Sequence, residues 1–241
     1  MTRLLLIETA TEVCSAAIAV EGKVIALAED PDQPNHAARL TLLIDQCTRQ
    51  AGILLAAIDA VAVSGGPGSY TSLRVGVSVA KGICYALDKP LIAVPTLQAL
   101  AAASLDSLSD SGIRPAAVCL LPMLDARRNE VWTAVYDSRL QEIVPAQPLI
   151  LEHNMFENFL RSVPETTTEN VFVVSGNGIK KMEEGLIGKN VVGSPVQKCS
   201  AKYFSGLAEH FFQNSDFQDI SYFEPFYMKK PNITTPNKPV F

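Results

Sequence analysis

The sequence lacks the patterns that hold most metal ions and disulfides. Its 241 residues include only 5 cysteines and 3 histidines. The cysteines are widely spaced among mostly apolar residues and form no Cys-x-x-Cys pair, which favours a reducing compartment and a core role. The histidines form no His-x-x-x-His or His-Glu-x-x-His pair, so no metal site is predicted.

Long apolar runs and an excess of basic residues are also missing. No run approaches the roughly 20 apolar residues of a membrane-spanning helix, and the N-terminus has no signal-peptide architecture. We therefore expect a cytoplasmic protein without membrane contact. The net charge of −5 at pH 7 argues against a self-sufficient nucleic-acid binder, although a local basic patch is compatible with it.

The sequence does contain a glycine-rich stretch from Ser64 to Gly76, between an apolar segment and a helical pattern. Glycine lets a ligand approach the backbone, and the N–H groups of a helix N-terminus attract phosphate. The stretch matches neither Gly-x-x-x-x-Gly-Lys-Ser/Thr nor Gly-x-Gly-x-x-Gly, because Lys81 lies far inside the helix. Two interpretations follow: phosphate binding, or a sharp Gly-Pro-Gly turn with Thr71 or Ser72 as the helix cap.

Hydrophobic periodicity predicts the same order of elements twice, a three-strand meander followed by alternating helices and strands. The first half has strands at 3–9, 15–20, 24–28, 60–63 and 91–94 and helices at 36–51, 72–87 and 96–105. The second half has strands at 116–121, 130–136, 140–144, 171–174 and 191–192 and helices at 152–161, 178–186 and 200–212. The repeat is architectural rather than a repeat of sequence.

This order predicts an α/β fold of two ribonuclease-H-like lobes in an actin-like arrangement, each with a mixed five-stranded sheet and helices. We expect an N-terminal lobe at 1–106, a C-terminal lobe at 115–214 and an extension at 215–241. Within the extension, 231–239 is expected to be extended or disordered because it contains three prolines and no periodic apolar face.

In folds of this class, the acid-bearing turn after the first strand of each lobe points into the cleft between the lobes and binds phosphate and its metal. The corresponding residues are Glu8 and Thr9 in the first lobe and Asp125 and Arg127 in the second.

Five motifs together resemble the TsaB family, and their order covers the chain up to about residue 230. The glycine-rich stretch is the most specific, and the second half has diverged more. The motifs are Ile7-Glu8-Thr9-Ala10-Thr11, His36-Ala37-Ala38-Arg39-Leu40, the stretch from Ser64 to Gly76, Asp125-Ala126-Arg127-Arg128-Asn129-Glu130-Val131 and Glu224-Pro225-Phe226-Tyr227.

The resemblance implies a non-catalytic subunit that binds and activates a TsaD-type catalytic subunit. That complex makes N6-threonylcarbamoyladenosine at position 37 of tRNAs reading ANN codons. A TsaE-type ATPase subunit docks on the pair, so ATP and magnesium are used by the partners and no cofactor is required by this chain. The family also forms homodimers in isolation, and tRNA is contacted only through the complex.

The residues themselves indicate whether this chain still binds ATP. Related ATPases normally have aspartate where Glu8 stands, and the added methylene displaces the carboxylate from a tightly held magnesium ion. They have glycine where Arg127 stands, and the arginine side chain fills space that phosphate needs. Arg127 could instead pair with an anion, or with Glu130 or Asp125. The candidate phosphate-binding residues are Glu8, Thr9, Gly66, Gly68, Ser69, Thr71, Asp125 and Arg127.

The resemblance implies that two helices, at 36–51 and 72–87, form the interface with the catalytic partner or with a second copy of the chain. Small residues lie on two faces of the second helix, Gly76 with Ala80 and Ser78 with Gly82 and Ala86, which favours burial on two sides over simple seating on its own sheet. We expect Gly76→Trp to abolish pairing while the monomer stays folded. The predicted interface residues are His36, Leu40, Leu43, Cys47, Arg74, Val75, Gly76, Val79, Ala80 and Ile83.

Two other functions remain open from the residues alone. One is an ATP-dependent phosphotransferase or carbamoyltransferase that uses Glu8, the glycine-rich stretch and Asp125. The other is a peptidase-like protein, which no metal-ligand pair or nucleophile–base motif supports. Lys229 and Lys230 could touch tRNA phosphates in an assembled complex or form a solvated basic pair.

Overall fold

The computed structural model describes residues 1–31, 35–108, 118–152, 155–164, 170–182 and 190–227. The extended segment expected at 231–239, together with Lys229 and Lys230, lies outside these residues. In the described part, no helix is long and apolar enough to cross a membrane.

The first half of the chain forms one mixed five-stranded sheet with the strand order β3-β2-β1-β4-β5. β1 pairs antiparallel with β2 and parallel with β4, so the meander and the parallel strands meet at β1. The elements are β1 (Arg3–Glu8), β2 (Cys14–Val20), β3 (Lys23–Asp30), α1 (His36–Ala51), the 3₁₀ turn η1 (Leu55–Ala57), β4 (Ala60–Ser64), α2 (Tyr70–Leu87), β5 (Leu91–Val94) and α3 (Thr96–Asp106).

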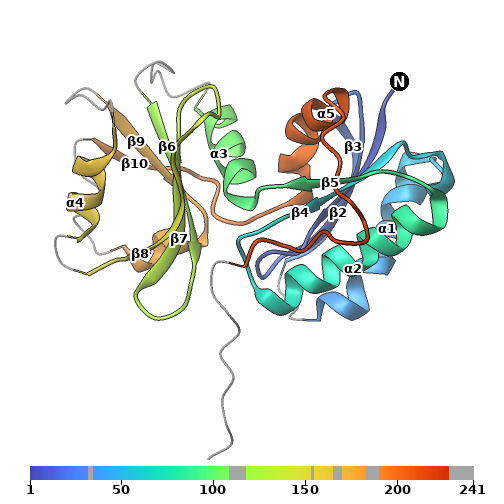
Figure 1. Ribbon diagram of the computed structural model, residues 1–241, viewed down its shortest axis with the longest axis horizontal. Coiled ribbons are helices and arrows are strands. Elements are labelled where there is room, and N and C mark those ends of the chain that lie inside the picture. The colour runs from blue at the N-terminus through green and yellow to red at the C-terminus, as the bar shows by residue number, and fades with distance from the viewer. Residues whose placement is uncertain (32–34, 109–117, 153–154, 165–169, 183–189, 228–241) are drawn as a thin grey trace, which may run out of the picture.

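The second half repeats this topology in a sheet with the order β10-β9-β6-β7-β8. Its elements are β6 (Val118–Asp125), β7 (Glu130–Tyr136), β8 (Glu142–Ile150), α4 (Met155–Ser162), β9 (Val171–Ser175), η3 (Asn177–Lys181), β10 (Val191–Gly193), η4 (Ala201–Phe204) and α5 (Ser205–Gln213). The two sheets lie side by side with α3 between them (Figure 1). The predicted fold class is therefore confirmed.

The strands of the first sheet alternate their side chains between two cores, as the period of a strand requires. In β1, Leu5 and Ile7 pack with α1 and α2, whereas Leu4 and Leu6 pack with η4 and α5 on the opposite face. α5 thus covers the first sheet although it follows the second in the chain. α3 packs mainly on the second sheet. The lobe boundaries remain a prediction, and the packing of these two helices crosses them.

Several predicted elements differ in their ends or type. α2 begins at Tyr70 with Ser69 as its N-cap residue, and neither Thr71 nor Ser72 has that position. The helix expected at 178–186 is the short 3₁₀ turn η3 in its described part, and the helix expected at 200–212 is divided into η4 and α5. α1 has the expected ends, because Asn35 caps its first turn and Gly52 follows it with a φ of 64°.

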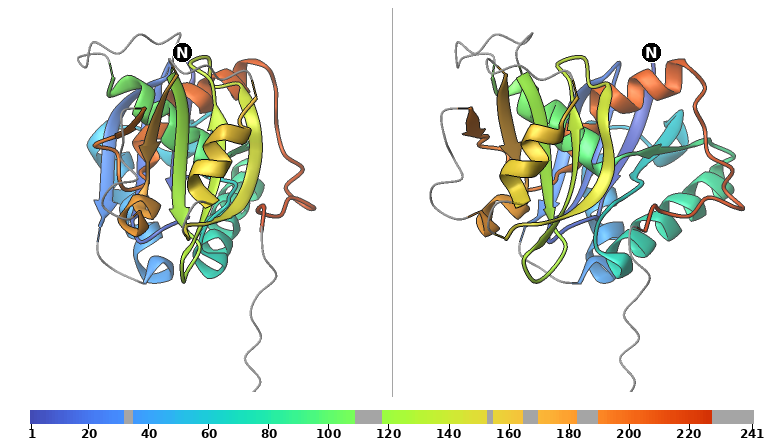
Figure 2. Two further views of the ribbon diagram at one scale, coloured as in Figure 1. Left: turned by 90° about the vertical axis from the view of Figure 1, so that its left-hand side faces the viewer. Right: turned by 60° about the vertical axis from the view of Figure 1, so that its left-hand side comes forward.

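After α5, residues 214–227 form a C-terminal strap that returns along the first lobe (Figure 2). The N–H of Gln218 donates to the carbonyl of Leu91 in edge strand β5 at 2.8 Å, and the N–H of Phe226 donates to the carbonyl of Gly65 at 2.7 Å. The strap therefore protects the edge of the sheet and ends against the glycine-rich stretch.

Candidate functional site

The turn after β1 carries the first predicted phosphate-binding residues, Glu8 and Thr9. Glu8 is fully buried, and one of its carboxylate oxygens accepts a hydrogen bond from the N–H of Ala10. The N–H of Thr9 donates to the hydroxyl of Ser64 at 3.2 Å. In an open turn, the N–H groups of Thr9 and Ala10 could donate hydrogen bonds to a phosphate, but here both already have acceptors within the protein.

Burial also changes the acidity of Glu8. Loss of hydration raises its pKa from 4.5 to about 7, although hydrogen bonds from Ala10, Ser64 and Thr9 lower it in part. The second carboxylate oxygen has no partner among the described residues. Glu8 is therefore an internal group of the fold whose charge is costly at neutral pH.

The glycine-rich stretch packs closely against Ala10 of the β1 turn and Phe226 of the strap. A Cβ on Gly68 would lie 2.5 Å from the carbonyl oxygen of Ala10, and one on Gly66 would lie 2.5 Å from that of Phe226. Gly66 also has a φ of 99°, which favours glycine. The N–H of Ser69 donates to the carbonyl of Ala10 at 2.7 Å. The glycines thus permit close packing against the β1 turn and the strap, in addition to turning the chain.

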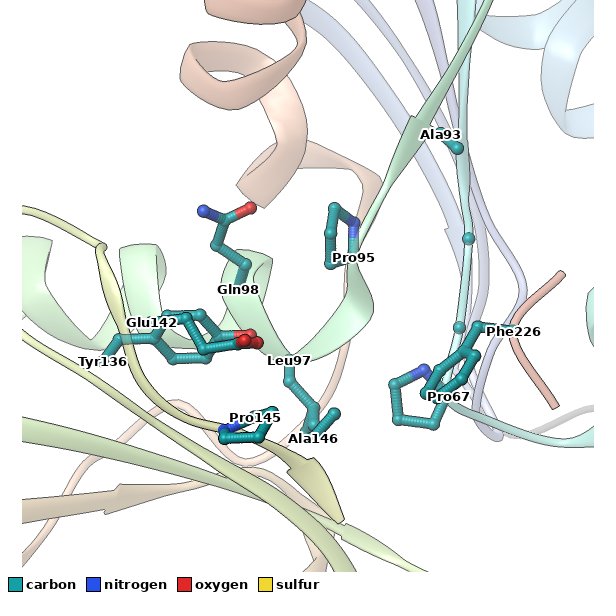
Figure 3. Close-up of a pocket in the computed structure, with 12 residues that line it drawn as sticks. Pro67, Ala93, Pro95, Leu97, Gln98, Tyr136, Glu142, Pro145, Ala146 and Phe226 are labelled. Atoms are coloured by element: carbon teal, nitrogen blue, oxygen red, sulfur yellow. The ribbon is translucent and has the colours of Figure 1, made fainter. Parts of the chain in front are cut away.

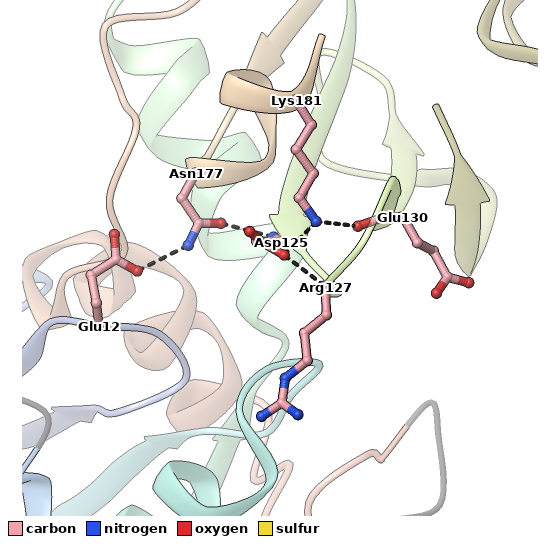
Figure 4. A network of polar contacts seen from close by, with 6 residues as sticks. All are labelled: Glu12, Asp125, Arg127, Glu130, Asn177 and Lys181. Carbon is pink, nitrogen blue, oxygen red and sulfur yellow. Dashed lines mark hydrogen bonds and ion pairs between the residues drawn. The ribbon is translucent and has the colours of Figure 1, made fainter. Parts of the chain in front are cut away.

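The second-lobe turn is closed in a different way (Figure 4). The carboxylate of Asp125 accepts a hydrogen bond from the N–H of Arg127 at 2.6 Å and forms an ion pair with the ammonium of Lys181 at 2.5 Å. The Arg127 side chain points away from Asp125 (Figure 4), so of the alternatives for Arg127 the pairing with Asp125 is not formed, and Lys181 pairs with Asp125. Sequence reasoning missed Lys181 because it lies 56 residues away in the chain.

Asn177 connects this turn to the first lobe. Its amide oxygen accepts from the N–H of Asp125 at 2.9 Å, and its amide nitrogen donates to the carboxylate of Glu12 at 2.9 Å. The two acid-bearing turns are therefore brought to the same junction between the lobes, as predicted, but each is tied to protein groups.

The acids at this junction do not fit a magnesium site of the actin-like kind. Such an ion needs carboxylate oxygens that are free to face it or its water ligands. One Glu8 oxygen is bonded to its own turn, the other is fully buried, and the Asp125 carboxylate is paired with Lys181. Among the described residues, no cluster of three or more His, Cys, Asp and Glu side chains could hold a metal ion.

The predicted interface residues of α1 face inward. His36, Leu40, Leu43 and Cys47 are buried, and the Cys47 thiol donates to the carbonyl of Ala16 in β2 at 2.9 Å. A partner could not reach these side chains while the helix stays on its sheet. This corrects the prediction, which selected the apolar positions of the helical period, and these are the positions that face the core.

α2 shows the same division between its faces. Gly76 and Ala80 are buried, and a Cβ on Gly76 would lie 2.3 Å from the hydroxyl oxygen of Thr9. Val75, Val79 and Ile83 are half-buried against the first core. The packing argues against the expectation that Gly76→Trp leaves the monomer folded, because even a Cβ at this position would collide with the Thr9 side chain.

We call the outer face the exposed side of α2 that carries Arg74, Ser78, Gly82 and Tyr85, together with the exposed Leu42 of the neighbouring helix α1. α1 and α2 are neighbours on one side of the sheet (Figure 1). Gly82 has nothing within 4 Å of the place of its absent Cβ. The second small-residue face in the sequence, Ser78 with Gly82 and Ala86, was the signal for this surface.

Two ribonuclease-H-like lobes, with an acid-bearing turn from each at their junction, form an actin-like fold. Solved structures agree on this fold: YeaZ from Pseudomonas aeruginosa matches with a TM-score of 0.73 and 24% identity over 94% of this chain and all of that chain. A polyphosphate/ATP-glucomannokinase from Arthrobacter sp. strain KM has a TM-score of 0.51 at 11% identity over 89% of this chain and 99% of that chain.

Sequence comparison is more specific than the fold. The family model "TsaD: tRNA N6-adenosine threonylcarbamoyltransferase" matches residues 31–235. The Haemophilus influenzae protein named tRNA threonylcarbamoyladenosine biosynthesis protein TsaB is 28% identical over 94% of this chain and 93% of its own length. The Escherichia coli protein of that name is 34% identical over 56% of this chain and 54% of its own. The chain belongs to the family that this TsaD model describes, and it is similar over most of its length to proteins named TsaB.

Proposed function

We propose that this chain takes part in the synthesis of threonylcarbamoyladenosine in tRNA, as the non-catalytic subunit that binds and activates a TsaD-type transferase. Membership of the TsaD family and the similarity to proteins named TsaB support the pathway. The observation that carries the non-catalytic role is that both acid-bearing turns are already occupied, by Ala10 at Glu8 and by Lys181 at Asp125.

The outer face of α1 and α2 is the proposed contact surface for the transferase. Small exposed residues such as Ser78 and Gly82 let another helix approach closely, and Tyr85 and Leu42 supply exposed apolar area, 82% and 56% accessible respectively. The same face would serve a homodimer of the isolated chain. We further propose that the TsaE-type ATPase joins through the assembled pair, and that tRNA is bound only there because the chain has a net charge of −5.

A titration of the isolated chain with magnesium-ATP separates this proposal from an ATP-dependent enzyme of the same fold. We expect no binding in the micromolar range and no turnover, because the N–H groups of Thr9, Ala10 and Arg127 already have acceptors. Micromolar binding with turnover that is lost in Asp125→Asn would overturn the non-catalytic role. A dye-displacement control with a known actin-fold ATPase verifies that the assay detects such binding.

Co-purification of the chain from its native cell, followed by mass spectrometry, tests the partners. The proposal expects the TsaD-type subunit in near-equal amount and the TsaE-type subunit in a smaller, nucleotide-dependent amount. Recovery of the chain without any transferase would contradict the proposed role.

A further inference from the structure

A pocket with a volume of about 540 Å³ lies between the lobes, and its lining includes neither of the acids at the two acid-bearing turns (Figure 3). One side is formed by Pro67 and by Phe226 of the strap, and the other by Tyr136 and Pro145 of the second lobe. Proline and aromatic rings therefore border a space of the size that holds small ligands. The proposed function uses none of these residues.

The hydroxyl of Tyr136 is a donor without a partner in this pocket. The residue is only 3% exposed, and its hydroxyl has no hydrogen bond with any of the described residues. Burial, and secondarily the charge of Glu142, raises the pKa of Tyr136, so the hydroxyl keeps its proton and can donate it in a hydrogen bond. An enclosed donor that lacks an acceptor is costly, which points to a ligand that supplies one.

Glu142 and Gln98 supply acceptors in the same lining. Glu142 lies opposite Tyr136 in the ladder of β7 and β8, and Figure 3 shows its carboxylate beside the Tyr136 ring. It is the one charged side chain among the described residues of the lining, and it has no ion pair with any of them. Gln98 donates its amide nitrogen to the carbonyl of Leu140 at 3.2 Å and keeps its amide oxygen as an acceptor. The pocket thus suits a cation that also carries an acceptor for the Tyr136 hydroxyl.

An α-amino amide combines these features in few atoms. Its ammonium can pair with the Glu142 carboxylate, and its neutral carbonyl oxygen can accept a hydrogen bond from the Tyr136 hydroxyl. A free amino acid fits less well, because its carboxylate would be repelled by Glu142 and the described lining offers no cationic side chain to offset this. An aromatic ring on the ligand would pack against Pro67 and Phe226.

We propose that this pocket binds an aromatic α-amino amide, with its ammonium on Glu142, its carbonyl on Tyr136 and its ring against Pro67 and Phe226. This chemistry occurs in small amides and at the N-terminal residue of a peptide. The ligand touches groups of both lobes, so its binding favours the arrangement in which the lobes lie this close together.

Isothermal titration of the full-length chain with L-phenylalaninamide tests this proposal. At about pH 6.5, below the roughly 7.7–8.0 pKa of an α-amino group, the ligand is a cation. We expect saturable binding with a dissociation constant of about 1 mM or lower. N-acetyl-L-phenylalaninamide lacks the ammonium, and L-phenylalanine has a carboxylate in place of the amide. Each of these two compounds should bind at least tenfold more weakly.

Two variants place the binding in this pocket. Glu142→Gln should weaken the binding of L-phenylalaninamide at least tenfold, and Glu142 is exposed, so the substitution leaves the core intact. Tyr136→Phe keeps the ring and removes only the hydroxyl, and it should weaken binding severalfold. The matched control is Glu157→Gln, which removes the same charge from an exposed helix position of the second lobe and should leave the affinity unchanged. Thermal unfolding verifies that each variant is folded.

Equal affinity for the amide and its acetylated form would overturn the proposal, as would unchanged affinity in the folded Glu142→Gln variant. The absence of binding up to about 10 mM L-phenylalaninamide would overturn it too. The amide of the tripeptide Phe-Ala-Ala distinguishes the two sources of this chemistry. Binding at least as tight as that of L-phenylalaninamide identifies the N-terminus of a peptide, and weaker binding identifies a small amide.

Discussion

The inner and outer faces of α2 differ in what they have room for. On the inner face, Gly76 lies against Thr9 so closely that a methyl group would collide with its hydroxyl. On the outer face, Gly82 has open space around it. Both glycines lie in the same helix, and the sequence around them does not show which one is buried. The face with Gly76 packs against the β1 turn, and only the face with Gly82 is accessible to a partner.

The largest expected effect on stability comes from Glu8 in the buried β1 turn. Because the folded pKa of Glu8 is about 7 and the unfolded value is 4.5, the folded state holds this proton more tightly. Glu8 therefore costs no stability below pH 4.5, costs more as the pH rises, and reaches its full cost above pH 7, about 3 kcal/mol. Glu8→Gln should raise the free energy of unfolding by about that amount at pH 8 and by little at pH 4.5, as measured by urea denaturation.

Glu157→Gln is the matched control, because Glu157 is an exposed helix residue paired with Arg161. It should change stability by less than about 0.5 kcal/mol. Parallel pH profiles for the Glu8→Gln variant and the unchanged protein would show that the turn is open to water.

The two glycines give a prediction with opposite signs. Alanine in place of glycine stabilises an exposed helix position by about 1 kcal/mol, so Gly82→Ala should raise the free energy of unfolding by that amount. Gly76→Ala should lower it by about 1–3 kcal/mol, because overpacking against Thr9 outweighs the gain in helix propensity. Urea denaturation measures both. Thr9→Ala should recover part of the loss in the double variant; changes of the same sign in the two single variants would contradict the packing.

The smallest effect is expected in the second-lobe turn. Lys181→Met removes the ion pair with Asp125 and a hydrogen bond to the carbonyl of Glu130, and should cost about 1 kcal/mol, less at high salt. Arg49→Met, which breaks a pair of exposed side chains with Asp45, should cost under about 0.5 kcal/mol. If Lys181→Met and Arg49→Met lower the free energy of unfolding by the same amount at 50 mM and at 500 mM salt, the Lys181–Asp125 pair stabilises this turn no more than an exposed ion pair does.

Much of the fold could be predicted from the sequence, because strands and helices in this chain follow clear periods of apolar residues. The open question was the meaning of small residues. Gly76 and Gly82 both lie on faces of small residues, but only Gly76 packs against the β1 turn, which is distant in the chain, and Gly82 is open. Leu40 and Cys47 were assigned to a partner because the resemblance implies that their helix forms the interface, but their apolar periodicity marks the core.

The sequence indicates that an acid-bearing turn follows the first strand of each lobe, but the bonding state of the two acids could not be predicted. The bond from Ala10 to Glu8 depends on the local geometry of a buried turn, and the partner of Asp125 comes from η3 far along the chain. Sequence identifies which acids reach the junction of the lobes. Only packing decides whether their oxygens are free.

The central claim is that this chain acts through the outer face of α2 on a TsaD-type transferase. The most direct test is the affinity of the purified transferase for Gly82→Ala and Gly82→Trp. We predict that Gly82→Ala binds within about threefold of the unchanged chain, whereas Gly82→Trp loses at least 100-fold while its unfolding free energy stays within about 1 kcal/mol. Unchanged binding of the Gly82→Trp variant would contradict the account.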